Sequence, residues 1–471
     1  MNRNILFLIP DERKVYENIG VKVGAFHLPS LAFAVLGAIA RQGGYEPVVL
    51  DLTLCTDDNA AVRERLAALQ PVFTGVTCTS ATYGQAVGLA RTVKAVCPST
   101  RMLIGGPHAS ATVEETLAKG CFDHVFIGEA EVAFARLLAG DDPAAIPGVA
   151  GRTATGVMYR GPAPPFLRNL DDFPMPDYGL YDLSRYPVSR LQARHNPVVW
   201  LETSRGCPFD CQICNKVVHG QTFRPKSAAR VLAELEQLVA AGVREVHIAD
   251  DGFTTDLARA EGICDALIAR RLPLVWSCVN GIRVDRVSRT LLTKMRRAGC
   301  YRISFGIESG NQAVLDGLGK RITLEQVRDA VALAKAAGLE VFGFFMFGFR
   351  DDTPGSMADT IAFAKSLRLD LAKASIVVPF PGSPLHEDYR RRGLLAEVDD
   401  DYRHYNVYGS MRRVYRHPTL DWETIERHQQ RFAREVYLNP GYVARRLMYA
   451  LRNGTLGSDL AAALSVKWFG K

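Results

Sequence analysis

The sequence of 471 residues has no long hydrophobic run. Its most apolar stretches, residues 28–40 and 341–349, are shorter than the roughly 18 residues that a membrane-spanning helix needs. The first residues have no long apolar segment followed by a small-residue cleavage site, so no secretory signal peptide is expected. Ten cysteines are too few and too scattered for a disulfide scaffold. We therefore expect a cytoplasmic protein whose cysteines stay reduced and can serve as ligands.

Over most of its length the chain also lacks an excess of charge of either sign. The formal net charge is +7, and residues 403–471 alone contain 12 Lys and Arg against 5 Asp and Glu. A basic tail indicates an anionic partner, such as a substrate, a membrane surface or a nucleic acid; a solvated helical surface is the alternative. The 48% of hydrophobic and 23% of charged residues are typical of globular domains and exclude a disordered chain.

Short apolar runs alternate with helical patterns over residues 1–140. The expected strands are 5–9, 47–51, 73–78, 102–105 and 125–127. This alternation predicts an α/β domain with a parallel sheet of the flavodoxin or Rossmann type, which binds ligands beyond the carboxyl ends of its strands. Residues 141–197 are punctuated by proline and are interpreted as a linker, with an irregular edge of the first domain as the alternative.

The alternation of strands and helices resumes at residue 198. The expected strands are 198–203, 245–249, 274–279, 302–306, 340–347 and 373–378. Six strands with helices between them predict a partial (β/α)6 barrel over residues 198–390, with its reactive groups at the carboxyl ends of the strands. Residues 391–471 lose this pattern and predict a mainly helical, basic C-terminal region.

The most specific motif is a group of three thiols, Cys207, Cys211 and Cys214, which follows the first barrel strand. Thiolates hold iron–sulfur clusters, and three of them leave one iron of a cubane open to a small molecule. A structural zinc site needs four ligands, and the only candidate for the fourth beside the three cysteines is His219. Three unrelated core cysteines are the remaining alternative. The spacing favours the cluster, with these cysteines as catalytic and metal-binding residues.

This CxxxCxxC motif, placed after the first strand of a partial barrel, resembles that of the radical S-adenosylmethionine (SAM) enzymes. The resemblance implies a [4Fe-4S] cluster whose open iron binds SAM and whose electron cleaves it to a 5′-deoxyadenosyl radical. It also implies SAM contacts at six positions: Ile213, Asp250, Asp251, Asn280, Glu308 and Gly348.

Several of these positions carry alternatives. Family members often have an aromatic residue where this chain has Ile213. Neighbouring residues of a strand point to opposite sides, so only one of the two aspartates is expected to face SAM, and we favour Asp250; a solvated acidic turn is the alternative. Glu308 could instead form a salt bridge to Arg283 or Arg302, and the aromatic run that ends at Gly348 could be barrel core.

A flavodoxin-like sheet ahead of such a barrel is similar to the cobalamin-binding radical SAM enzymes, which include methyltransferases and the anaerobic magnesium-protoporphyrin ester cyclases. Three loops at predicted strand ends carry this resemblance. The candidate cobalamin contacts are Thr77, Thr79, Ser80, Tyr83, Gly105, Gly106, Pro107, His108, Gly128 and Glu129. No DxHxxG motif occurs, which implies cobalamin without a histidine ligand and with its lower face on the loop 77–83. A nucleotide-binding or cofactor-free domain is the alternative.

The resemblance predicts a cobalamin-dependent radical SAM enzyme that methylates an unactivated carbon through methylcobalamin. Ring closure, contraction or oxidation with the same cofactors is one alternative, and a non-catalytic metal- or cobalamin-binding protein is another. The expected partners are a small-molecule substrate, amphiphilic or anionic like a lipid or tetrapyrrole, and a flavodoxin- or ferredoxin-type electron donor. The C-terminal region is a candidate for peripheral membrane contact, whereas no nucleic-acid-binding module is visible.

Overall fold

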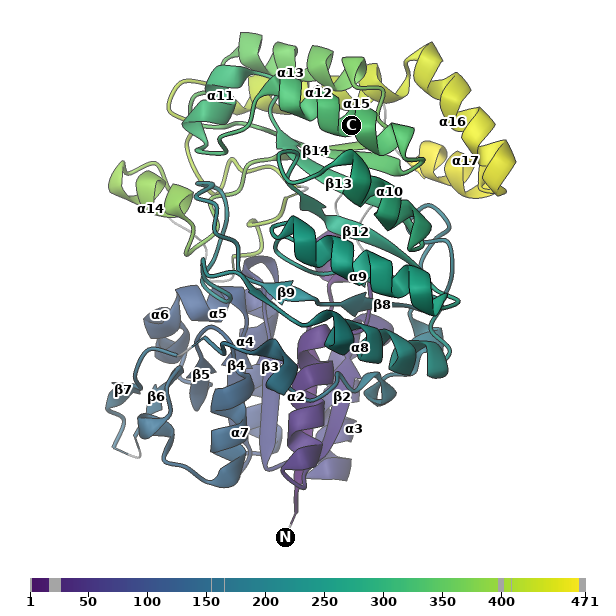
Figure 1. The fold of residues 1–471 in the computed structure, drawn as a ribbon. Coiled ribbons are helices and arrows are strands. Elements are labelled where there is room, and N and C mark those ends of the chain that lie inside the picture. Colours follow the sequence, from purple (N-terminus) through teal and green to yellow (C-terminus); the bar gives the residue numbers. More distant parts are fainter. Residues whose placement is uncertain are drawn as a thin grey trace.

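The computed structural model describes residues 2–16, 27–153, 155–164, 166–396, 402–407 and 409–465. Two α/β units lie one above the other, and the helices after residue 420 lie on the far side of the second unit (Figure 1). This arrangement confirms the predicted fold class of a parallel-sheet domain, a partial barrel and a helical C-terminal region. Among the described helices, none is long and apolar enough to cross a membrane.

The first unit is built on a seven-stranded sheet with the order β2-β1-β3-β4-β5-β6-β7. Its strands are β1 (Asn4–Ile9), β2 (Glu46–Asp51), β3 (Phe73–Thr77), β4 (Arg101–Gly105), β5 (His124–Phe126), β6 (Val149–Arg152) and β7 (Met158–Arg160). The first five are parallel, and β6 and β7 are antiparallel. The sheet thus continues past residue 140 into the proline-rich segment, as in the alternative that the sequence leaves open.

Helices cover both faces of this sheet. They are α1 (Arg13–Tyr16), α2 (Leu31–Gln42), α3 (Asp58–Leu69), α4 (Tyr83–Val96), α5 (Pro107–Ala111), α6 (Val113–Ala118) and α7 (Glu131–Ala139). Ser30 and Asp57 accept from amides of the first turns of α2 and α3, which explains where these helices begin. The helices α2 and α7 pack together on one face, and α3 and α4 on the other.

The second unit is an open barrel of six parallel strands with the order β15-β14-β13-β12-β11-β8. The strands are β8 (Val198–Leu201), β11 (Glu245–Ile248), β12 (Val275–Ile282), β13 (Cys300–Glu308), β14 (Glu340–Phe347) and β15 (Leu371–Ile376). The intervening helices are α8 (Ala228–Ala240), α9 (Leu257–Arg270), α10 (Arg289–Arg297), α11 (Gln312–Gly317), α12 (Leu324–Ala336) and α13 (Pro354–Ser366). A two-stranded ribbon, β9 (Ser204–Arg205) and β10 (Arg224–Pro225), flanks the cysteine segment.

Helix α14 (Pro384–Arg391) follows the last barrel strand, and the described part of the C-terminal region contains α15 (Trp422–Tyr437), α16 (Pro440–Asn453) and α17 (Leu456–Ser465). Helix α15 covers the edge strand β15. The side-chain amide of Gln429 donates to the Ala374 carbonyl (3.2 Å), and the backbone amide of Ala372 donates to the Tyr437 hydroxyl (3.0 Å). The polar edge of an open barrel is thereby closed to other strands.

Three buried tyrosines join the two units. The hydroxyl of Tyr178 donates to the Trp200 carbonyl (2.6 Å), and that of Tyr181 donates to the Ser30 carbonyl (2.9 Å). The hydroxyl of Tyr186 donates to Asp51 (3.0 Å). One apolar core therefore runs from the α2 face of the first sheet into the barrel.

Candidate active site between the two sheets

A cavity of about 370 Å³ lies between the two units. Its lining includes Ile9, Glu12 and Thr77 from the first unit, and Trp200, Ala249 and Asn280 from the barrel. Most of these residues lie at or just beyond the carboxyl ends of β1, β3, β11 and β12. Both sheets therefore present their ligand-binding edges to one shared space.

The three cysteines lie on a loop whose backbone is fixed on both sides. Gly206 has φ +79°, and a Cβ there would lie 2.2 Å from the Thr222 carbonyl oxygen, so only glycine fits. The Gln212 amide donates to the Leu318 carbonyl (3.1 Å), and the Leu385 amide donates to the Gln212 carbonyl (2.9 Å). The loop is thus tied to the ends of two other barrel segments.

Cations surround the thiols. Cys207 and Cys211 are half-buried, and Cys214 is exposed. Nη1 of Arg283 lies 3.9 Å from Sγ of Cys211. A hydrogen bond with Cys214 and the positive charges of Lys320 and Arg283 lower the pKa of the Cys211 thiol. Burial raises the pKa of the Cys207 thiol, and the shared hydrogen bond raises that of Cys214. The donor set suits a cluster because three thiols lie together on one short loop beside these cations.

His219, the fourth ligand that a zinc site would need, is engaged elsewhere. Its Nδ1 lies 3.0 Å from Oε1 of Glu129 in the first unit. The structure therefore gives this histidine a partner from another domain.

The two predicted SAM aspartates have different surroundings. Asp250 is buried, and its carboxylate accepts from the Thr203 amide (2.6 Å), the Thr203 hydroxyl (2.5 Å) and the Ser204 hydroxyl (2.6 Å). Asp251 is exposed and accepts from the Gly206 amide (2.9 Å). Asp250 thus holds the strand that leads into the cysteine loop, whereas Asp251 is the more accessible carboxylate.

Glu308 ends β13 with φ +69°, and its Oε1 accepts from Nζ of Lys320 at 2.7 Å. A Cβ at Gly306 would lie 2.8 Å from that oxygen, so a larger residue there would displace the Glu308 carboxylate. The partner of Glu308 is therefore Lys320, because Arg283 pairs with Asp285 and Arg302 pairs with Glu340.

The other predicted SAM residues differ in how deeply they are buried. Asn280 is exposed, lines the shared cavity and donates to the Ala249 carbonyl (2.8 Å). Ile213 is half-buried against the main core. Gly348 is buried, and its carbonyl accepts from the Tyr415 hydroxyl (3.2 Å).

The predicted cobalamin loops form a compact cluster around His108. Oγ of Ser80 lies 3.0 Å from Nδ1 of His108, and the Tyr83 ring lies 4.3 Å from the imidazole. Burial lowers the pKa of His108 to about 3, and among the described residues its Nε2 has no hydrogen-bond partner. A buried donor or acceptor without a partner is the kind of group that a ligand completes.

The remaining predicted cobalamin residues divide into two places. Thr77 lines the shared cavity, Thr79 is exposed, and Gly105, Gly106 and Pro107 join β4 to α5. Gly106 has φ +102°, and a Cβ there would lie 2.6 Å from the Cys78 carbonyl oxygen. Gly128 and Glu129, by contrast, are buried against the cysteine segment.

Comparison with known proteins identifies both units. Residues 201–364 match the model of the radical SAM superfamily, and residues 18–138 match that of the B12 binding domain. An uncharacterized methyltransferase of Pyrococcus horikoshii is 30% identical over 403 residues, which cover 84% of this chain and 85% of that protein. The anaerobic magnesium-protoporphyrin IX monomethyl ester cyclase of Rubrivivax gelatinosus is 26% identical over 412 residues, covering 85% and 72%.

The fold is similar to that of TsrM from Kitasatospora setae, a radical S-adenosylmethionine methyltransferase solved with cobalamin and a [4Fe-4S] cluster bound. The TM-score is 0.72 at 19% identity, covering 92% of this chain and 91% of that one. The fold and site thus define an enzyme that uses a cluster, SAM and cobalamin. The chain belongs to the radical SAM enzymes that carry a B12-binding domain.

Some residues of the site have no signal in the sequence. Glu12 and Trp200 line the cavity, and Lys320 approaches the thiols, although none of them lies in a motif. Arg205 directly precedes Gly206 and the first cysteine, and this adjacency is the one clue that could have drawn attention to it.

Proposed function

We propose that this enzyme transfers a methyl group to an unactivated carbon of a small molecule. The observation that carries the proposal is the shared cavity, which is lined by strand ends of both the B12-binding unit and the barrel. When bound, SAM on the cluster supplies a radical initiator and cobalamin supplies the methyl group. Transfer needs both cofactors to reach one substrate, and a single cavity provides that access.

The residues of the chain would orient the substrate and keep water away from the reacting carbon. Ile9, Leu28, Leu31 and Trp200 give the cavity apolar walls. Arg283 and Lys320 favour the thiolate form of Cys211, and Asp251, Asn280 and Glu308 offer polar contacts to SAM near the same strand ends. A dry cavity protects a radical from side reactions.

The test is a product balance. The anaerobically reconstituted enzyme, loaded with cluster and cobalamin, is incubated with a low-potential reductant, with SAM carrying a CD3 group, and with the small-molecule extract of cells that lack the gene. We expect a product that contains the intact CD3 group, together with S-adenosylhomocysteine and 5′-deoxyadenosine in equal amounts. Formation of 5′-deoxyadenosine alone would contradict methyl transfer and favour ring closure, contraction or oxidation. Cys207→Ala, Cys211→Ala and Cys214→Ala should each abolish 5′-deoxyadenosine and the CD3-containing product, while each variant still binds cobalamin.

For the substrate we propose an amphiphilic anion such as a lipid or a tetrapyrrole. The apolar walls of the cavity suit a large hydrocarbon surface, and the excess of basic residues lies in the C-terminal region. One relative is named for its action on a magnesium porphyrin ester, which supports a substrate of this kind.

We further propose that the C-terminal helices contact the surface of an anionic membrane. Of the eleven large hydrophobic side chains that are exposed in the described residues, seven lie in this region. This C-terminal apolar surface consists of Leu438, Val443, Leu447, Met448, Leu451, Leu460 and Leu464. A cavity of about 470 Å³ near the start of α16 is lined by Lys365, Arg368 and Arg445. Apolar side chains beside cations suit acyl chains and anionic headgroups.

For the electron donor we propose an acidic flavodoxin- or ferredoxin-type protein. Pro208 and Asp210 on the cysteine loop are exposed, so a partner can reach this loop from solvent. Beside this loop Arg321 is also exposed, with its guanidinium 3.8 Å from Asp210. A cation at the rim of the cluster loop would attract an acidic reductase.

A further inference from the structure

A buried group of charged side chains joins the B12-binding unit to the cysteine loop. We name this group the interdomain clasp, and it consists of Glu129, Glu131, Glu202, Arg205 and Arg224. Arg224 donates to both oxygens of Glu129 (2.6 and 2.9 Å), and Arg205 donates to Glu131 (2.6 Å). Arg205 also donates to Glu202 (2.8 Å) and lies 3.5 Å from Glu129.

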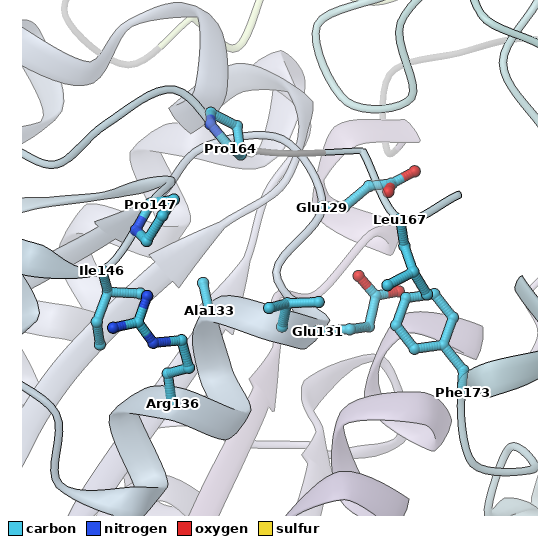
Figure 2. A pocket seen from close by; sticks show the side chains of 10 residues that line it. Glu129, Glu131, Ala133, Arg136, Ile146, Pro147, Pro164, Leu167 and Phe173 are labelled. Carbon is cyan, nitrogen blue, oxygen red and sulfur yellow. The ribbon is translucent and has the colours of Figure 1, made fainter. Parts of the chain in front are cut away.

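Aromatic residues of the proline-rich segment cover the clasp. The guanidinium of Arg224 lies 4.8 Å from the Phe166 ring, and that of Arg205 lies 5.2 Å from the Phe173 ring. Figure 2 shows Glu129 and Glu131 on the same side of a small pocket as Leu167 and Phe173. The side chains of both arginines are only 5–6% exposed. Water is therefore largely excluded from these ion pairs.

The charges of the clasp are nearly balanced. Three carboxylates face two guanidinium groups, and His219 lies 3.0 Å from Glu129 as a further donor. In a buried network each charge depends on the others, because removing one partner leaves an uncompensated charge. The clasp is therefore a stiff connection, and its members cannot separate independently.

The clasp contacts both of the segments that the sequence predicts to bind the two cofactors. Arg205 is two residues before Cys207, and Nη2 of Arg224 donates to the His219 carbonyl (3.0 Å) at the end of the cysteine segment. On the other side, Glu129 follows Gly128 at the end of β5. A Cβ at Gly128 would lie 3.5 Å from the Val218 carbonyl oxygen. The loop after β5 thus rests on the segment that follows the cluster cysteines.

We propose that the clasp couples the two cofactor sites, so that a loaded cluster tightens the binding of cobalamin. Cluster loading fixes the three cysteines and hence the ribbon that carries Arg205 and Arg224. This ribbon holds Glu129 and Glu131, and so pre-orders the loop after β5 before cobalamin arrives. A ligand that binds an already ordered loop pays less conformational entropy. Glu129, Glu131, Arg205 and Arg224 are positioning residues in this proposal.

The test compares the dissociation constant of hydroxocobalamin for the full chain with and without its cluster, under anaerobic conditions. Absorbance reports cobalamin binding, and iron content reports cluster loading. For the wild type we expect at least about fivefold tighter binding in the cluster-loaded form, within the usual range of coupling. In Glu131→Gln this ratio should fall to about one while both cofactors still bind. Glu131→Asp, which keeps the charge but shortens the reach, should lie between the two and serves if Glu131→Gln folds poorly.

Glu340→Gln is the matched control. Glu340 also pairs with a buried arginine, Arg302, at 2.8 Å, but at the opposite end of the barrel strands. It should lose a similar amount of stability and keep the wild-type ratio. The proposal would be overturned if cluster loading did not change the dissociation constant of the wild type, or if both Glu131 variants kept the ratio of the wild type. It would also be overturned if Glu340→Gln lost this ratio as fully as Glu131→Gln. Because only binding is measured, the result does not depend on whether methyl transfer occurs.

Discussion

The backbone amide of Gly206 donates a 2.9 Å hydrogen bond to Oδ2 of Asp251. It links the residue before the first cluster cysteine to the end of β11. The neighbouring Asp250 binds Thr203 and Ser204 on the strand before that glycine. Adjacent carboxylates thus brace one loop at successive points, one from a buried and one from an exposed position.

This difference in burial predicts different effects of removing the two carboxylates. Asp250→Ala leaves three buried donors without an acceptor and should lower the free energy of unfolding by about 2–3 kcal/mol, with reduced cluster loading. Asp251→Ala removes an exposed contact and should cost about 1 kcal/mol or less, with weaker SAM binding as its main effect. Urea denaturation and the change in the cluster EPR signal on SAM addition measure the two quantities. A larger loss of stability in Asp251→Ala would contradict the assignment.

The glycine at the start of the cysteine loop gives a second prediction. Gly206→Ala places a Cβ 2.2 Å from the Thr222 carbonyl in a left-handed backbone, so the loop must move and iron loading should fall at least about fivefold. Gly242→Ala is the matched control, because Gly242 has φ +90° but nothing within 4 Å of a Cβ. It should cost only about 1–2 kcal/mol of backbone strain and keep full iron content. Equal iron content in both variants would show that the close contact has no role in shaping the loop.

The fold could be predicted from the sequence further than the site could. Strands 5–9 and 340–347 and the helical pattern at 83–96 agree with the structure because their apolar periodicity reports burial directly. The short strands β6 and β7 escaped prediction, since a glycine at 151 and nearby prolines hide their pattern. The contact between Arg224 and Glu129 spans 95 residues, and no local pattern records it. Glu308 likewise pairs with Lys320, whereas the alternative left open beside its predicted SAM contact was a salt bridge to Arg283 or Arg302.

Buried His108 predicts a loss of stability in mild acid. Burial lowers its pKa from 6.5 to about 3, with His386 and Lys119 adding to the effect. In the unfolded chain His108 therefore becomes protonated below pH 6.5, whereas in the folded chain it stays neutral down to about pH 3. The stabilisation is complete above pH 6.5 and declines by about 1.4 kcal/mol for each pH unit below it.

Urea denaturation of the cofactor-free chain at pH 7.5 and pH 5.5 measures this loss. His108→Gln cannot take up the proton and should lose about 1 kcal/mol less than the wild type between these pH values. A residual loss is expected from His124, whose pKa burial lowers to about 4. An unchanged pH dependence in His108→Gln would refute the assignment to this histidine.

The C-terminal apolar surface predicts binding to anionic vesicles. Leu447 and Leu451 lie four residues apart on α16 and are 48% and 65% exposed. The double variant Leu447→Glu, Leu451→Glu should bind phosphatidylglycerol vesicles about tenfold more weakly than the wild type in cosedimentation. Val157→Glu, at a site that is 62% exposed in the first unit, is the control and should bind normally. The wild type could instead fail to bind vesicles while the double variant has a lower molecular mass than the wild type in light scattering. In that case the surface is an interface between copies of the chain.

Arg321 predicts a charge-dependent step in reduction of the cluster. Its side chain is 81% exposed beside the cysteine loop, so Arg321→Glu should repel an acidic flavodoxin at the point of electron entry. We expect reduction by flavodoxin to slow about threefold to tenfold at low salt, with the difference vanishing at high salt, where exposed charges are screened. Dithionite, a small reductant that needs no docking, should reduce both proteins at the same rate. Arg297→Glu, at the opposite end of the barrel on α10, makes the same change in net charge and should leave the flavodoxin rate unaltered. Equal slowing in both variants would assign the effect to net charge and remove the case for a docking site beside the cysteine loop.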